Sequence, residues 1–255
     1  MTLIVGILCE DGVVIGADSA VTFSANSQLH TIEQKDTKIY IHENQVIHAG
    51  TGSVGLSQRF FKVICDYWSS GKYKNPANKH SLQIGKELCT DGLRDFDSTF
   101  LRPGQLGFGA LCAFYKDGGF HLCEFATNTL QPEFKTKNLW YVSMGNGQLI
   151  ADTLLAFIRR TLWRKNQLPT VDEATFAALW VLQITIDINT GGVNGPPVIA
   201  TLKKVDNQPH AEFINDGKIA EHDESIKALE KHIENFPNIF EKQDVKDVPP
   251  PPPGP

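Results

Sequence analysis

Thr2 has the clearest chemical potential in this sequence, and only Met1 precedes it. A small residue at the second position lets an aminopeptidase remove Met1, so we expect a mature chain that begins with threonine. A threonine with a free α-amino group carries a nucleophilic hydroxyl and a general base in one residue. The N-terminus therefore predicts a nucleophile that acts through its own amine.

Two charged residues could support such a nucleophile. Asp18 ends the apolar run 13–17, and it lies opposite Thr2 if the strands on either side of residues 10–11 form a hairpin. Lys38 begins a later strand. A lysine disfavours protonation of a neighbouring amine and stabilises developing negative charge, and a carboxylate can hold that lysine in place. The alternative, from spacing alone, is a structural ion pair at the end of a sheet.

A glycine-rich segment, Gly50–Gly55, matches the pattern G-x-G-x-x-G between a strand and a helix. That pattern is typical of dinucleotide sites only where a second parallel strand follows. Here a polar loop and another helix follow, so we expect no such site. The segment instead predicts a tight turn whose backbone N–H groups could face an anion.

The elements that position these residues alternate between runs of strands and pairs of helices. This order favours an α+β fold, a four-layer αββα sandwich of two mostly antiparallel sheets with helix pairs outside. The stretch 24–36 is predicted as a loop or irregular strand. The predicted strands are 2–9, 12–19, 38–41, 45–49, 108–115, 120–125, 139–144, 197–204 and 211–214. The predicted helices are 53–71, 82–96, 148–163, 170–187 and 222–242, with Ser53 and Thr170 or Asp172 as the start signals of two of them.

Composition is that of a soluble globular protein, with 41% hydrophobic and 21% charged residues. The 11 acidic residues from Asp206 onward outnumber the 5 basic ones, which argues against a nucleic-acid partner. Five scattered cysteines without CxxC spacing indicate free thiols in a reducing cytoplasm. The N-terminus has no basic segment of a signal peptide, and no apolar run is long enough to span a membrane.

The chain divides into three predicted parts. Residues 2–205 form the main domain, and 206–248 form a C-terminal strand with an acidic helical extension. Residues 249–255 form a proline-rich tail that we expect to adopt polyproline II, as a solvated segment or as a docking peptide for a partner. Histidines and cysteines lack ligand spacing, so neither a metal site nor a cofactor is expected.

Several segments resemble the proteasome β-type subunits and bacterial HslV, which are N-terminal-nucleophile hydrolases with an αββα sandwich. The matching segments are Thr2–Gly6, Asp11–Ser19, Lys38–Tyr40, Ala49–Gly52, Ser143–Gly147 and Asp187–Gly192, in the order of the family. The acidic extension is similar to a divergent bacterial form such as the betaproteobacterial proteasome homologue.

The resemblance implies a role for each matching residue. Thr2 is the nucleophile, Asp18 and Lys38 are the charged pair, and the Gly50 N–H supplies the oxyanion hole. The implied pocket residues are His48, Ala49 and Gly52, and Asn146, Asp187 and Thr190 would support the amine and its water. Asn146 and Thr190 stand where the family usually has serine. Lys38 is preferred over Lys35 because Ile39-Tyr40 follows it.

The resemblance further implies a threonine-type endopeptidase that forms stacked rings and acts on peptides or unfolded proteins, with an AAA+ unfoldase as a possible partner. Two alternatives stay open. An inert ring subunit of the same fold is favoured by Asn146 and by the unusual C-terminus. The other alternative is an amidase or acylase that uses Thr2 on small molecules.

Overall fold

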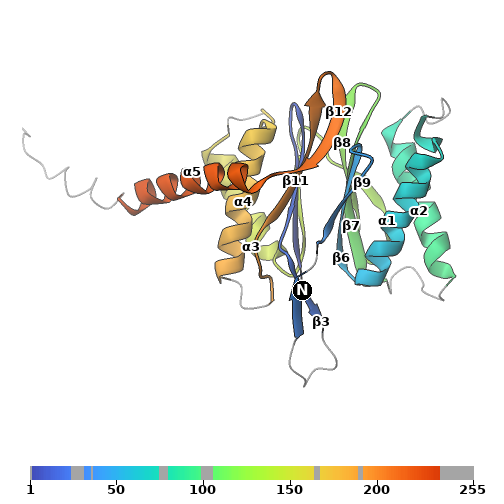
Figure 1. The fold of residues 1–255 in the computed structure, drawn as a ribbon, viewed down its shortest axis with the longest axis horizontal. Coiled ribbons are helices and arrows are strands. Elements are labelled where there is room, and N and C mark those ends of the chain that lie inside the picture. Colours follow the sequence, from blue (N-terminus) through green and yellow to red (C-terminus); the bar gives the residue numbers. More distant parts are fainter. Residues whose placement is uncertain are drawn as a thin grey trace, which may run out of the picture.

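Two antiparallel sheets face each other, and helices cover both outer faces (Figure 1). The computed structural model describes residues 2–23, 32–35, 37–74, 80–98, 106–163, 167–188 and 192–235. The strand orders are β10-β1-β2-β11-β12 and β5-β6-β7-β8-β9, with a separate β3-β4 pair. The predicted α+β class and the αββα layering are therefore confirmed.

The first sheet carries the predicted N-terminal hairpin. Its strands are β1 (Leu3–Leu8), β2 (Gly12–Ala17), β10 (Tyr141–Gly145), β11 (Val198–Val205) and β12 (Gln208–Phe213). Ile4 pairs with Ala17 and Leu8 with Val13, so the hairpin register brings the start of β1 to the end of β2. Both strands are buried along their whole length, as expected from their continuous apolar runs.

The second sheet contains β5 (Ile39–His42), β6 (Val46–Gly52), β7 (Phe108–Lys116), β8 (Gly119–Phe125) and β9 (Pro132–Phe134). Side chains alternate along β6. Ile47 and Ala49 join the core shared with the first sheet, whereas Val46 joins the core beneath the helices. Strand β9 and strand β3 (Ala20–Phe23) fall where no strand is predicted. Strand β4 (Ile32–Lys35), the partner of β3, falls in the stretch 24–36, which is predicted as a loop or irregular strand.

Helices α1 (Val54–Ser69) and α2 (Ser81–Asp97) cover the second sheet, and α3 (Gln148–Thr161) and α4 (Val171–Ile188) cover the first. The predicted start signals are confirmed. Ser53 accepts a hydrogen bond from the Leu56 N–H at 3.4 Å. Thr170 and Glu173 form a reciprocal capping box, in which the Thr170 N–H donates to Glu173 at 2.8 Å. In the described part of the chain, no helix combines the length and the apolarity needed to cross a membrane.

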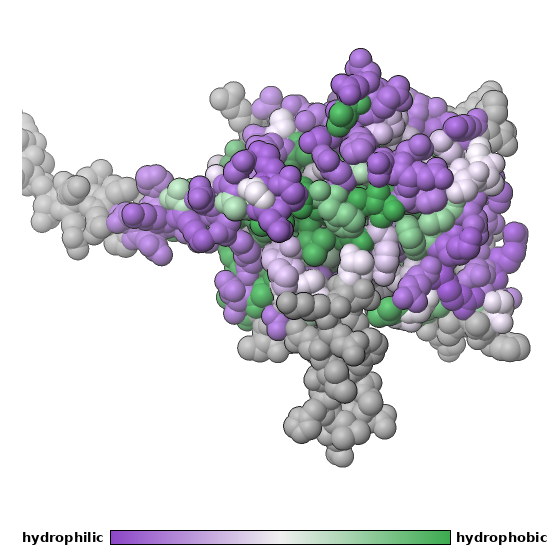
Figure 2. All heavy atoms as spheres, in the orientation of Figure 1, coloured by the Kyte–Doolittle hydropathy of each residue, from purple (hydrophilic) through white to green (hydrophobic). Residues whose placement is uncertain are grey.

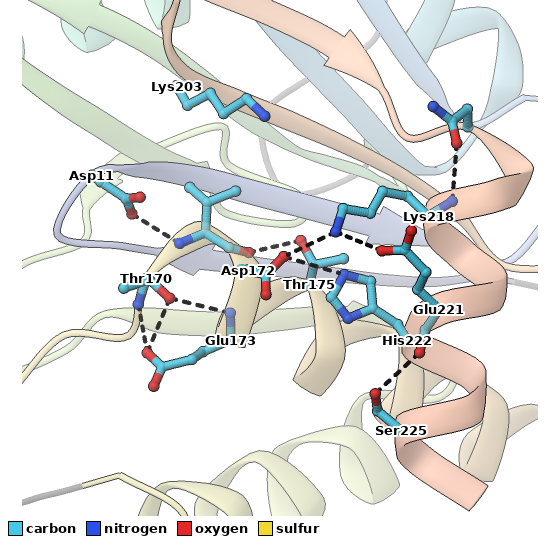
Figure 3. A network of polar contacts seen from close by, with 12 residues as sticks. Asp11, Thr170, Asp172, Glu173, Thr175, Lys203, Lys218, Glu221, His222 and Ser225 are labelled. Carbon is cyan, nitrogen blue, oxygen red and sulfur yellow. Dashed lines mark hydrogen bonds and ion pairs between the residues drawn. The ribbon is translucent and has the colours of Figure 1, made fainter.

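Helix α5 (Asp216–Glu234) begins six residues before the predicted start at residue 222. The reason is a cap, because the Asn215 side chain accepts the Lys218 N–H at 2.9 Å. Figure 3 shows how its first turns meet α4: Asp172 lies 3.8 Å from the Lys218 ammonium and 3.6 Å from the His222 ring. Helix α5 thus packs on the body of the sandwich, and the predicted helical residues 236–242 lie outside the described residues.

The predicted domain boundary at residue 205 falls inside a β-hairpin. Strand β12 pairs with β11 after the turn at Asp206 and Asn207, which both have positive φ.

The Ala211 N–H of β12 donates to the Asn44 carbonyl at 2.7 Å, which joins β12 to the turn between β5 and β6. The edge strands of the two sheets therefore meet on one face. Figure 2 shows apolar side chains in the middle of the molecular face that it draws, with hydrophilic ones above them and to their right. The proline-rich tail 249–255 lies outside the described residues.

Candidate active site

The Asp18 carboxylate forms the centre of the candidate site. It is fully buried just after β2, and its Oδ1 accepts hydrogen bonds from the Lys38 ammonium at 2.6 Å and the Leu3 N–H at 2.8 Å. Its Oδ2 accepts the Asn194 N–H at 3.2 Å. A buried carboxylate is tolerated when it is paired and hydrogen-bonded in this way. The predicted Asp18–Lys38 pair is thus present, and it joins the two sheets.

Thr2 lies directly beside this pair. The N–H of the Thr2–Leu3 peptide is the one that Asp18 accepts, and the carbonyl of the same peptide faces the Gly147 N–H at 3.5 Å. Thr2 is only 8% exposed. The surrounding backbone therefore orients both polar groups of this peptide unit. This fixes the orientation of Thr2 relative to β1, which begins at the next residue.

The turn after β10 approaches Thr2 closely. Gly145 has a φ of +99°, and a Cβ at this position would lie 2.2 Å from the Thr2 carbonyl oxygen. The same point is 3.1 Å from the Thr51 hydroxyl. Only glycine fits both the left-handed backbone and this contact. The close approach also identifies Thr51, a buried hydroxyl on β6, as a neighbour of Thr2 that the sequence did not indicate.

The Gly50 N–H, to which the resemblance assigns the oxyanion hole, already has a partner. It donates to the Lys38 carbonyl at 3.2 Å, as a continuation of the β5–β6 pairing. On the other side of Gly50 lies Ser57 of α1, whose hydroxyl would be 2.0 Å from a Cβ at Gly50. The glycine is thus explained by the close approach of α1 to β6.

The three predicted pocket residues do not share one surface. His48 is fully buried on the helix side of β6, with Nε2 3.3 Å from the Ser57 hydroxyl and the ring stacked against Phe61 at 5.8 Å. Burial lowers the pKa of His48 to about 3, so the ring is neutral. Ala49 faces the core between the sheets. Gly52 has a φ of +90°, and the Gly107 carbonyl blocks any side chain there.

A family comparison is consistent with this arrangement of Thr2, Asp18 and Lys38 at one end of two packed sheets. The model of the proteasome subunit family matches residues 2–191. The chain belongs to the proteasome subunit family. At the level of the family, membership supports a threonine-type peptidase that self-associates into rings. No curated protein sequence matches the chain.

Two residues that the proteasome resemblance assigns to the amine lie at the surface. Asn146 is exposed in the turn between Gly145 and Gly147. Asp187 is exposed near the end of α4, where it lines a cavity of about 340 Å³ together with Gly195 and α5. Within the described ranges, no hydrogen bond or ion pair links either side chain to Thr2. Thr190 lies outside the described residues.

The structure also adds residues to this proteasome-type site that the sequence did not indicate. The Asn194 N–H donates to Asp18, although the two residues are 176 positions apart in the sequence. No local sequence pattern indicates this contact. Ser19 and Thr185 are buried near the site, and within the described part of the chain their hydroxyls have no hydrogen-bond partner. The sequence contains one indication of Thr51. Ile47 and Ala49 occupy alternate positions of β6 and face the apolar core, and Thr51 is a polar residue at the next such position.

For the possible metal ligands and the cysteines, the sequence predicts no metal site and free thiols. Among the described residues, no group of three or more histidine, cysteine, aspartate or glutamate side chains is placed to hold a metal ion. All five cysteines are free thiols, as predicted, and four of them are buried.

Proposed function

We propose that the chain is a threonine-type endopeptidase in which Thr2 is the nucleophile once Met1 has been removed. The Thr2 hydroxyl attacks the carbonyl carbon of the scissile bond, and its proton passes to the Thr2 α-amine. The amine returns that proton to the leaving nitrogen as the peptide bond breaks. Water then hydrolyses the ester on Thr2, which releases the second product and restores the hydroxyl.

One observation carries the proposal: Asp18 binds the Lys38 ammonium and the Leu3 N–H through the same oxygen. This carboxylate couples a buried cation to the residue that follows the nucleophile. A nearby ammonium disfavours protonation of the Thr2 amine and stabilises negative charge that develops on the threonine oxygen. The pair therefore supports the step in which the proton leaves the Thr2 hydroxyl.

The Gly50 N–H remains our proposed donor to the oxyanion of the tetrahedral intermediate. Since it donates to the Lys38 carbonyl in the free protein, the oxyanion must share or replace that 3.2 Å bond. Ala49, Gly52 and His48 of the same strand remain proposed pocket residues. Asn146, Asp187 and Thr190 remain proposed to support the amine and its water.

We place the chain among the β-type or HslV-type bacterial members, with stacked homomeric rings in the cytoplasm. Its substrates would be peptides or unfolded proteins, delivered by an AAA+ unfoldase to an enclosed chamber. The proline-rich tail is a candidate docking segment for that unfoldase.

The test is covalent labelling of the purified full chain. A peptide epoxyketone reacts with a threonine hydroxyl and a free amine on the same residue, so intact-mass and peptide mass spectrometry should find one adduct on Thr2. Thr2→Ser should retain the adduct, and Thr2→Ala should lose it together with peptide hydrolysis. Removal of Met1 without any adduct would contradict the proposal.

The inert ring subunit is the second candidate, because the Gly50 N–H is paired and Asp187 lies in the cavity beside α5. This candidate predicts assembled rings with no adduct and no hydrolysis. A Thr2 adduct together with hydrolysis of small amides, but not of peptides, would instead select the amidase or acylase.

A further inference from the structure

The loop formed by residues 192–197 lies against the segment that carries Asp18. The Asn194 N–H donates to Asp18 Oδ2 at 3.2 Å, and the Asn194 carbonyl accepts the Ala20 N–H at 3.0 Å. One residue of the loop thus binds the chain on both sides of Ser19. Val198, at the start of β11, then pairs with Ala17, so the loop continues directly into the sheet.

Gly195 brings the loop into close contact with Ser19. Its φ is +81°, and its N–H is accepted by the Asn194 side chain at 2.7 Å. A Cβ at Gly195 would lie 2.5 Å from the Ser19 hydroxyl. Both the left-handed backbone and the short approach therefore require glycine at this position.

Ser19 has little freedom to give way. It is 7% exposed, and among the described residues its hydroxyl has no hydrogen-bond partner. Its contact with the loop is therefore one of packing. An added Cβ at Gly195 requires the buried Ser19 side chain or the loop to shift, and the backbone atoms Ala20 N and Ser19 C lie next, at 3.4 and 3.5 Å. Pro196 and Pro197 follow Gly195 and have fixed φ angles, which limits how the loop could absorb such a displacement.

We propose that the loop 192–197 is a positioning element for the Asp18–Lys38 pair, with Asn194 and Gly195 as its positioning residues. Asp18 Oδ1 binds both the Lys38 ammonium and the Leu3 N–H, so a shift of the carboxylate changes both contacts. The loop would act on Thr2 only through this carboxylate. The inference rests on the proposed function of Thr2, and it extends that function to a part of the chain beyond the residues matched by the family.

The test compares two glycines with nearly the same backbone. Gly195 has a φ of +81° and Gly118 a φ of +82°, but a Cβ at Gly118 meets nothing within 4 Å. G195A and G118A therefore share the strain of a positive φ, and G195A adds the contact with Ser19 and the restriction that Pro196 places on the residue before it. We expect G195A to lower kcat for peptide hydrolysis by roughly 10- to 100-fold. G118A should stay within about twofold of the wild type, whatever thermal stability it loses.

Rescue separates a positional effect from a general loss of folding. S19A removes the oxygen that the new Cβ would meet, so G195A/S19A should recover kcat relative to G195A. Two milder variants, N194A and N194S, test the same proposal if G195A does not fold. N194A removes the acceptor for the Gly195 N–H and should reduce kcat by a few-fold, whereas N194S retains a hydroxyl acceptor and should reduce it less. Equal losses of kcat in G195A and G118A, or in N194A and N194S, would overturn the proposal.

A readout without catalysis distinguishes failure of this inference from failure of the proposed function. Lys38 is 7% exposed and bound to Asp18, so an amine-acylating reagent should label it slowly in the folded protein. G195A should increase labelling of Lys38, as measured by peptide mass spectrometry, and G118A should leave it unchanged. This result would support the positioning role even in a chain that hydrolyses nothing, and unchanged labelling in a folded G195A would contradict it.

Discussion

The Asp18 carboxylate accepts the Leu3 N–H at 2.8 Å through the oxygen that also binds Lys38. Leu3 begins β1 and Asp18 directly follows the adjacent strand β2, whereas Lys38 directly precedes β5 of the facing sheet. One buried oxygen therefore joins the hairpin that carries Thr2 to the second sheet. The stability of the fold and the proposed chemistry both depend on this oxygen atom. Their contributions can be measured apart only by comparing a single substitution at Asp18 with a double substitution that also changes Lys38.

Asp18→Asn should uncouple the two effects when it is combined with a change at Lys38. The single substitution leaves a buried ammonium without its counter-charge, so we expect a loss of about 3–5 kcal/mol in the free energy of unfolding. Hydrolysis should fall by roughly 100-fold or more. Lys38→Met in the Asp18→Asn background should recover part of the stability and none of the activity, as measured by urea unfolding and kcat/KM. Recovery of activity in the double variant would contradict the role of the pair.

His48 should make the protein sensitive to acid. Its pKa is about 3 in the folded protein because of burial, against an ordinary value near 6.5. The unfolded chain therefore binds a proton below pH 6.5 that the folded protein excludes, and stability is lost as the pH falls from 6.5 toward 3. At about 1.4 kcal/mol for each pH unit, the loss reaches about 3 kcal/mol at pH 4.5.

The measurement is the free energy of unfolding against pH. His48→Phe keeps an aromatic ring beside Phe61 and removes the proton, so its curve should be flatter between pH 6.5 and 4.5. The exposed His232 of α5 provides a control, and His232→Gln should retain the slope of the wild type. An unchanged slope in His48→Phe would show that other groups cause the acid sensitivity.

Gly145→Ala tests the close approach of the β10 turn to Thr2. The added Cβ would meet the Thr2 carbonyl at 2.2 Å, in a backbone with φ of +99°. Gly71 has a φ of +71° and open space around it, so Gly71→Ala measures the backbone strain alone. We expect about 1 kcal/mol of lost stability for Gly71→Ala and about 2–4 kcal/mol for Gly145→Ala. Only Gly145→Ala should slow adduct formation at Thr2, and equal effects of both variants would refute the contact.

Ile226→Ala tests whether the C-terminal helix belongs to the folded core. Ile226 is 2% exposed on α5, and its truncation should cost about 2–4 kcal/mol in the free energy of unfolding. Ile233 on the same helix is 51% exposed, and Ile233→Ala should change stability by less than about 0.5 kcal/mol. If both variants unfold at the same denaturant concentration, α5 contributes nothing to the cooperative unit.

Local signals in the sequence accounted for much of the fold. The hairpin at residues 10–11, the caps at Ser53 and Thr170 and the order of strands and helices each depend on neighbours within a few positions. The predicted start of helix α5 lies six residues too late, because its charged sequence has a weak apolar stripe and the helix begins at the Asn215 cap. Strand β9 has only three residues, too few to show a period.

Thr2, Asp18 and Lys38 could be selected by the sequence itself, because a charged residue at the end of an apolar strand needs a buried partner. Tertiary structure decided which atoms meet. Packing of the two sheets brings Lys38 to Oδ1 of Asp18. Pairing of β11 with β2 inside the first sheet brings Asn194 to Oδ2, and pairing of β5 with β6 inside the second sheet leads the Gly50 N–H to the Lys38 carbonyl. Asp187 lines a cavity together with residues of α5. Strand periodicity specifies which face a side chain occupies, but the distance between two faces depends on how the layers pack.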